Sequence, residues 1–171
     1  MLSEKMNVAI NEQINKELFS EYLYLSMSAW FESEGLPGFA SWMAVQAQEE
    51  HFHAMKLYGY INERGGRVIL EAIDKPESEF GNPAKAFDAT MEHEQFITSS
   101  INGLVDLAIE LKDHATNQFL QWYVEEQVEE EASAQGIIDK LKWIGDNGNA
   151  LLMMDRELGA RVFTPPASEG E

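Results

Sequence analysis

Two triplets of residues with metal-binding side chains repeat at the same internal spacing, which is 33 and then 3 residues. The triplets are Glu17, Glu50 and His53 in the first half, and Glu94, Gln127 and Glu130 in the second half. Carboxylate oxygens and an imidazole suit Fe(II), Mn(II) or Zn(II) better than a soft metal. Residues three apart lie one turn apart on one face of a helix, so Glu50 and His53 can reach one ion. The repeated spacing predicts a metal site with pseudo-twofold symmetry.

The acids of both triplets fall inside rows of apolar residues. Four segments carry such rows at alternating spacings of three and four residues, which is typical of core-facing helices in a bundle. Glutamates interrupt all four rows in mid-segment, and burying an unpaired carboxylate costs several kcal/mol. Single glutamates on two helices, with Glu-x-x-His on others, are the pattern of di-iron carboxylate bundles. The rows therefore predict a cationic centre inside a four-helix core.

Glycine and proline divide the chain into segments that must position these side chains. The helices that we predict cover residues 4–34, 38–64, 84–112, 115–145 and 148–160. The break near residues 112–114 contains neither glycine nor proline. Short connections make antiparallel hairpins, whereas the crossover at 65–82 is long enough to place the second and third helices in parallel. We expect an all-α four-helix bundle with one long crossover and a short C-terminal fifth helix. One domain would span residues 1–163, followed by a flexible tail at 164–171.

The composition of the chain favours some classes of binding partner and excludes others. The net charge is -18 and the 12 Lys and Arg residues are scattered, so cations are better partners than nucleic acid or anionic membrane. The absence of cysteine excludes disulfides, iron–sulfur clusters and a thiol nucleophile. The longest uncharged run, Gly35 to Gln48, has 14 residues and is too short for a membrane span. Residues 1–5 do not begin a signal peptide, and we expect a cytoplasmic protein.

Several runs of residues resemble the bacterial and archaeal non-haem ferritins, and the resemblance extends over residues 3–166. The matching runs are ELFSEYLYLSM at 17–27, QEEHFHA at 48–54, EHE at 92–94 and FLQWYVEEQVEEE at 119–131. The last run is the most specific of the four. The resemblance implies a ferritin-like bundle that assembles into a hollow shell of 24 subunits.

The resemblance also implies the roles of individual residues in a ferroxidase centre. Glu17, Glu50 and His53 would hold one iron, with Glu50 bridging to a second iron. The second iron would take Glu94 and Glu130, with Gln127 and Tyr24 nearby. A third iron site would use Glu49, Glu126 and Glu129. Haem is not expected, because His51 replaces the methionine found after the bridging glutamate of haem-binding relatives.

The function that we expect is oxidation of Fe(II) by dioxygen at the di-iron centre, followed by storage of an Fe(III) mineral. The alternatives are a ferritin-like di-iron oxidase or oxygenase that acts on an organic substrate, and a non-catalytic bundle whose acids are structural. Shell symmetry and pore width stay open at this stage. His51, His93 and His114 are expected at the surface, and Tyr24 could hydrogen-bond a ligand or donate an electron.

Overall fold

The computed structural model describes residues 1–165, and five helices make up the regular structure of this part of the chain. They are α1 (Glu4–Ser33), α2 (Pro37–Glu63), α3 (Pro83–Glu110), α4 (His114–Ile144) and α5 (Gly148–Leu158). The predicted all-α class and element order are confirmed, and each predicted helix end lies within two residues of the observed one. None of these helices is both long and apolar enough to cross a bilayer. Residues 166–171, which form most of the expected tail, lie outside the described part.

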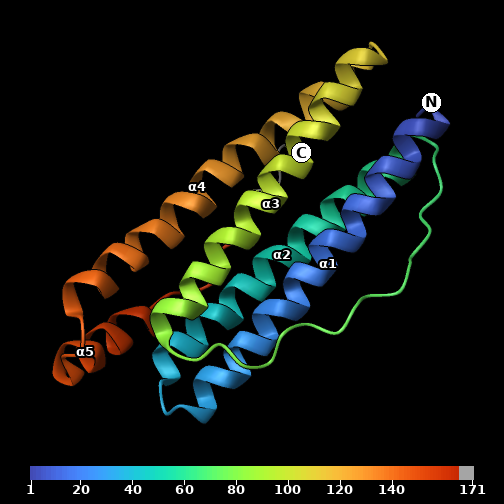
Figure 1. Cartoon of the computed structure of the whole chain (residues 1–171). Helices are drawn as coiled ribbons and strands as arrows, with labels where there is room; N and C mark the ends of the chain where they lie inside the picture. The colour runs from blue at the N-terminus through green and yellow to red at the C-terminus, as the bar shows by residue number, and fades with distance from the viewer. Residues whose placement is uncertain (166–171) are drawn as a thin grey trace.

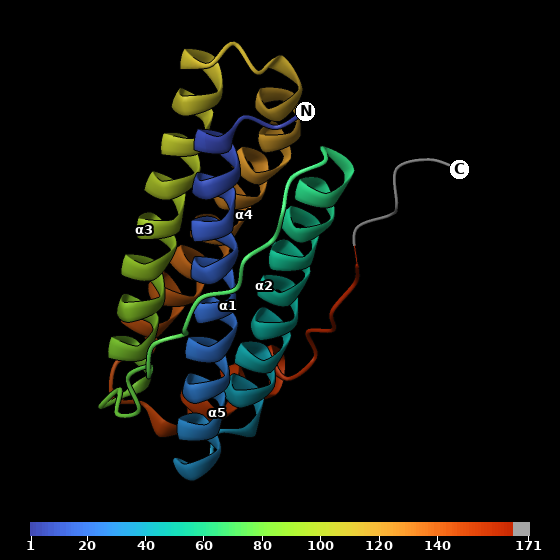
Figure 2. The ribbon, with the colours of Figure 1, turned by 90° about the vertical axis from the view of Figure 1, so that its right-hand side faces the viewer.

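The bundle consists of two antiparallel hairpins, α1–α2 and α3–α4, with α5 across one end (Figure 1). The crossover between α2 and α3 has no regular structure and runs along the outside of α1 and α2 (Figure 2). Asparagine side chains on one face of α1 hold it in place. The amide of Asn11 accepts from the backbone N–H of Ile69 at 2.7 Å and donates to the carbonyl of Arg67 at 3.0 Å. Asn15 donates to the carbonyl of Ala72 at 3.0 Å. These hydrogen bonds give partners to backbone groups of the crossover, which has no regular structure to supply them.

The apolar core has two parts with a polar layer between them. One cluster lies near α5 and is rich in aromatic side chains such as Phe31, Phe39 and Phe87, and the other lies toward the opposite end of the bundle. All six residues of the two triplets are buried between these clusters. A polar layer in mid-core destabilises a bundle unless its groups find partners, so this layer is the candidate functional region.

Helix α5 is fixed to the start of α2 by a side-chain cap. Asp155 Oδ1 accepts from the backbone N–H groups of Gly38 and Phe39, at 2.8 and 3.0 Å. These N–H groups belong to the first turn of α2, which has no partner for them within the helix. A Cβ at position 38 would overlap the backbone carbonyl of Asp155, so only glycine allows this approach.

Gly38→Ala is therefore expected to lower the free energy of unfolding by about 2–3 kcal/mol, because the added methyl group must push α5 off its cap. Chemical denaturation of the metal-free protein measures this. Gly59→Ala is the matched control: it lies on the same helix and nothing approaches its added Cβ within 4 Å. An equal effect of the two substitutions would contradict the proposed close packing.

Candidate metal centre

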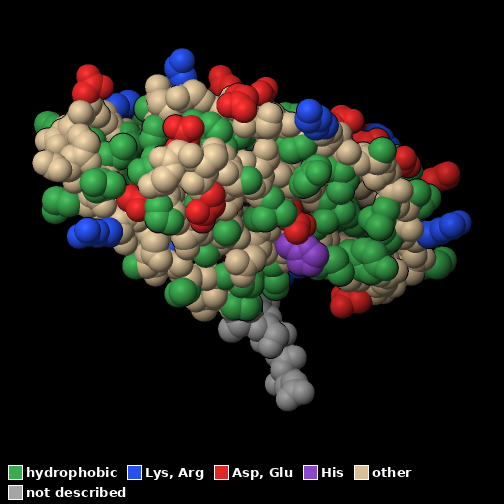
Figure 3. Space-filling view, turned by 90° about the horizontal axis from the view of Figure 1, so that it is seen from below, with side chains coloured by type: hydrophobic (Ala, Val, Ile, Leu, Met, Phe, Trp, Pro, Cys, Tyr) green, Lys and Arg blue, Asp and Glu red, His purple; other side chains and the backbone are tan. Residues whose placement is uncertain are grey.

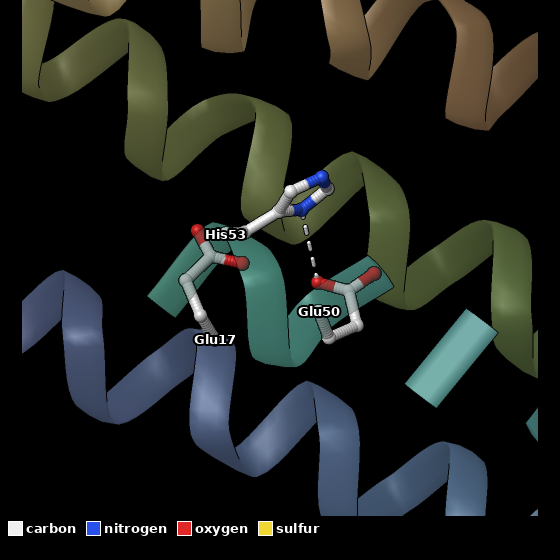
Figure 4. Close-up of side chains that lie close together, drawn as sticks. All are labelled: Glu17, Glu50 and His53. Atoms are coloured by element: carbon white, nitrogen blue, oxygen red, sulfur yellow. Dashed lines mark ion pairs between the residues drawn. The ribbon is translucent and has the colours of Figure 1, made fainter. Parts of the chain in front are cut away.

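The first triplet converges on one space between α1 and α2. Glu17 projects from α1, and Glu50 and His53 project from adjacent turns of α2 (Figure 4). Ligand atoms from these three residues lie within 4.8 Å of one another, and Nδ1 of His53 is 3.4 Å from Oε2 of Glu50. The three side chains are almost completely buried. Two carboxylates and an imidazole in this arrangement can hold one divalent cation.

The second triplet lies opposite, on α3 and α4. The Gln127 amide donates to Oε2 of Glu94 at 3.1 Å, and the Tyr24 hydroxyl donates to Oε1 of the same carboxylate. Glu130 offers a carboxylate oxygen within 4.8 Å of ligand atoms of His53 and Glu126. The structure therefore brings the residues of both triplets, together with Tyr24, into one buried layer.

Gln46 joins the two halves of this layer. Its Nε2 donates to Oε1 of Glu50 at 3.1 Å and to Oε2 of Glu130 at 2.7 Å. On α1, Gln13 makes the corresponding contact, donating to Oε1 of Glu17 at 2.7 Å. Sequence reasoning missed both glutamines as supports of the site. The signal was available, because each stands four residues before a glutamate of the first triplet, and residues with that spacing are neighbours on a helix.

One buried oxygen lacks a partner. Oε2 of Glu17 is inaccessible to solvent and makes no hydrogen bond within the described part of the chain. A buried acceptor without a partner costs about 1–3 kcal/mol, and more when it is charged. This oxygen belongs to the triplet that can surround a cation, so a bound metal ion would satisfy it.

Burial also changes the protonation of these acids. It is the main cause that raises the pKa of Glu17 to about 8, with a further contribution from the charge of Glu50. The pKa values of Glu50, Glu94 and Glu130 are raised, in each case mainly by burial. The metal-free centre therefore holds protons at neutral pH, because clustered carboxylates in a dry core resist ionisation.

The three acids expected to form a third site are arranged less uniformly. They line a cavity of about 110 Å³ next to His53 and Glu130. Glu126 has a carboxylate oxygen within 4.8 Å of ligand atoms of His53 and Glu130, and Glu129 is exposed. The Glu49 carboxylate instead accepts a hydrogen bond from the guanidinium of Arg161. Sequence reasoning did not identify Arg161, and no local pattern pointed to it.

The histidines outside the triplets differ in burial. His51 and His114 are exposed, as expected. His93 is instead largely covered: its Nε2 lies 2.7 Å from the hydroxyl oxygen of Ser20, and its ring packs against Phe19 and Tyr24. Burial lowers the pKa of His93 to about 4. It is neutral at physiological pH, and its side chain is only partly exposed, where the sequence suggested a surface position.

This layer of carboxylates, histidine and glutamine inside a four-helix bundle is a candidate metal centre, of the kind found in di-iron carboxylate bundles. The family described as "Ferritin: Ferritin-like domain" matches residues 7–144, and the chain belongs to that family. A bacterial non-heme ferritin of Bacteroides fragilis is 48% identical over 94% of this chain and 100% of its own length.

Two solved ferritins of the archaeon Archaeoglobus fulgidus have nearly the same fold. One is described as a novel open pore ferritin: it is 54% identical, covers 95% of this chain and 100% of its own, and has a TM-score of 0.94. The other is a form engineered to be closed: it is also 54% identical, covers 96% and 100%, and has a TM-score of 0.95. Identity at this level over whole chains extends the family assignment to all five helices.

Proposed function

We propose that this ferritin stores iron and has ferroxidase activity: it binds Fe(II), passes the electrons of the iron to dioxygen, and retains the Fe(III) product. The observation that carries this proposal is the buried layer of four carboxylates and one histidine, in which an oxygen of Glu17 has no hydrogen-bond partner among residues 1–165. Ferritin-family membership and the non-heme ferritin relatives support the same activity.

The substrate would occupy two positions in this layer. Glu17, Glu50 and His53 would hold the first Fe(II), and Glu94 and Glu130 the second. Glu50 would bridge, which is supported by its place beside His53 and by the Gln46 amide that it shares with Glu130. Four ionised carboxylates would balance the charge of two Fe(II) ions. The second position lacks an imidazole, since Gln127 offers only a neutral amide, and no haem is expected at either position.

Tyr24 and the cavity acids would have secondary roles. The Tyr24 hydroxyl would orient Glu94, to which it donates. Glu49, Glu126 and Glu129 would hold a third iron beside the di-iron centre, which is supported by the cavity that they line together. This third position would be the weakest, because Glu49 is already paired with Arg161 and Glu129 is exposed.

A shell of many subunits, which we propose to number 24, would hold the mineral. Large apolar side chains are exposed on the outer faces of α1 and α2 and on the crossover: Tyr22, Leu25, Met55, Tyr58, Ile69 and Leu70. Figure 3 shows apolar side chains over much of the face that is seen from below, with charged groups between them. Such surfaces are typical of contacts with other subunits. We place the shell in the cytoplasm.

Aerobic addition of Fe(II), followed by sedimentation, tests storage. We expect a hollow particle that accumulates far more iron than its di-iron centres can bind, because the product moves from the centre to the interior. Product that stops at one equivalent per centre would favour an oxidase or oxygenase with an organic substrate. The complete lack of oxidation would favour a structural role for the acids. Particles no larger than a dimer at physiological salt would contradict storage.

A further inference from the structure

The chain beyond α5 folds back over the mouth of the acidic cavity. Residues 159–165 leave the base of the bundle and run beside α2 (Figure 2). Arg161, Phe163 and Thr164 of this segment line the cavity, opposite Glu126 and Glu129. The segment therefore forms part of the wall of the proposed third metal site, although it is far from that site in sequence.

Arg161 is held in this wall by three kinds of contact. Its guanidinium donates to Oε2 of Glu49 and, at 2.9 Å, to Oε1 of Gln46. Its plane lies over the ring of Trp42, with 4.4 Å between the guanidinium carbon and the ring centroid. Arginine is suited to this position because its planar group can stack and donate in two directions at once. The side chain is 23% exposed, so water screens the pair with Glu49 only partly.

The contact with Gln46 connects this arginine to the di-iron layer. An amide oxygen that accepts from Arg161 leaves the amide nitrogen to face the other way, where it donates to Glu50 and Glu130. Arg161 thus helps to fix the orientation of the amide that joins the two halves of the centre.

The contact with Glu49 has the larger consequence. Glu49 is one of the three acids of the proposed third site, yet its carboxylate already has a positive partner supplied by the same chain. A divalent cation at this carboxylate must either displace the guanidinium or be repelled by it at close range. We propose that Arg161 is a tethered cation that competes with divalent metal for Glu49, so that the third position fills last and empties first. The inference rests on the proposed third site.

The affinity of the Arg161→Gln variant for metal ions tests whether Arg161 competes with metal for Glu49, and this measurement does not require iron oxidation. Anaerobic calorimetry with Zn(II), which binds such ligands and is redox-inert, measures the affinities of successive ions on the assembled protein. We expect the third ion to bind about tenfold more tightly to Arg161→Gln than to the wild type. The substitution removes one nearby positive charge that repels the metal ion and that water screens only partly. Arg161→Lys, which keeps the charge, is expected to retain most of the weaker binding.

Two further variants separate this effect from general electrostatics and from the site itself. Arg156→Gln removes an equal charge from the exposed surface of α5 and is expected to leave the third affinity unchanged. In a Glu49→Gln background, Arg161→Gln is expected to have no further effect, because the carboxylate for which the two cations compete is gone.

The outcomes that overturn the inference are distinct from each other. If three ions bind and the third binds Arg161→Gln no more tightly than the wild type, Arg161 does not compete with the metal, although the third site exists. Only two ions on every variant would remove the third site and the inference together, while the di-iron centre stands. Tightening in Arg156→Gln as large as in Arg161→Gln would reduce the effect to net charge.

Discussion

Glu50→Ala and His53→Ala are each expected to slow the rapid oxidation of Fe(II) by at least about 100-fold, since even the supports of metal ligands contribute 10–100-fold. Glu50 would bridge both irons, and His53 would supply the only imidazole of the centre. Stopped-flow oxidation at two Fe(II) per subunit measures this loss directly.

The same substitutions are expected to leave the bundle folded. Glu50→Ala removes a buried carboxyl whose raised pKa shows that burial disfavours its charged form. At position 53, Tyr123 donates to the backbone carbonyl at 2.8 Å, and that bond survives the loss of the imidazole. Helical circular dichroism and sedimentation check the fold and assembly. Glu63→Ala and His114→Ala, at exposed positions, are the matched controls. Normal oxidation combined with altered stability would instead assign the buried acids a structural role.

The helices could be predicted from the sequence because residues at or near their ends determine where they begin and end. Pro37 and Pro83 stand in the first turns of α2 and α3, where a missing N–H costs nothing, and Gly145 ends α4 with a positive φ. Between these points the apolar rows have a helical period throughout. The paired spacing of acids then placed the two triplets at one height, because equal distances from the turns in two antiparallel hairpins meet in mid-bundle.

The unpredicted contacts join residues that are far apart in the chain. Asp155 caps Gly38 across 117 positions, and Arg161 reaches Gln46 across 115. Neither residue belongs to a periodic row, and an exposed Asp or Arg on a short terminal helix or segment would look the same in sequence. His93 illustrates the same limit, because Phe19 and Ser20 of the neighbouring helix α1 cover part of its ring, and no pattern within α3 indicates these contacts.

The binding of Fe(II) to the empty centre is expected to release protons and to tighten as the pH rises from about 6 to about 8. The four carboxyls are protonated more readily than usual, and burial holds the pKa of Glu17 near 8. Metal binds the ionised form, so each proton that is still present at a given pH must leave. Affinity therefore increases with pH until it passes the raised pKa values, and is level above them.

Protein stability has the opposite dependence when the metal is absent. A carboxyl whose pKa is raised from 4.5 in the unfolded chain to about 8 in the fold favours folding at low pH. That contribution is lost as the pH rises through this interval, because the unfolded chain ionises first. Glu17→Gln keeps the shape and the hydrogen bond from Gln13 but cannot ionise. We expect this variant to be more stable than the wild type at pH 8 without metal, and to bind the first Fe(II) far more weakly.

Anaerobic Fe(II) calorimetry in two buffers of different ionisation enthalpy measures the protons released. We expect a buffer-dependent heat and two unequal affinities, with the position of Glu17, Glu50 and His53 filled first, because Gln127 contributes only a neutral amide to the other. An unstable second position also favours transfer of the product into storage. Two equal sites without any buffer-dependent heat would contradict both the protonated centre and its asymmetry. The stability of the metal-free Glu17→Gln variant at pH 8 is a further test. If it is no higher than that of the wild type, burial of the Glu17 carboxylate does not destabilise the metal-free fold, and metal binding has no such cost to offset.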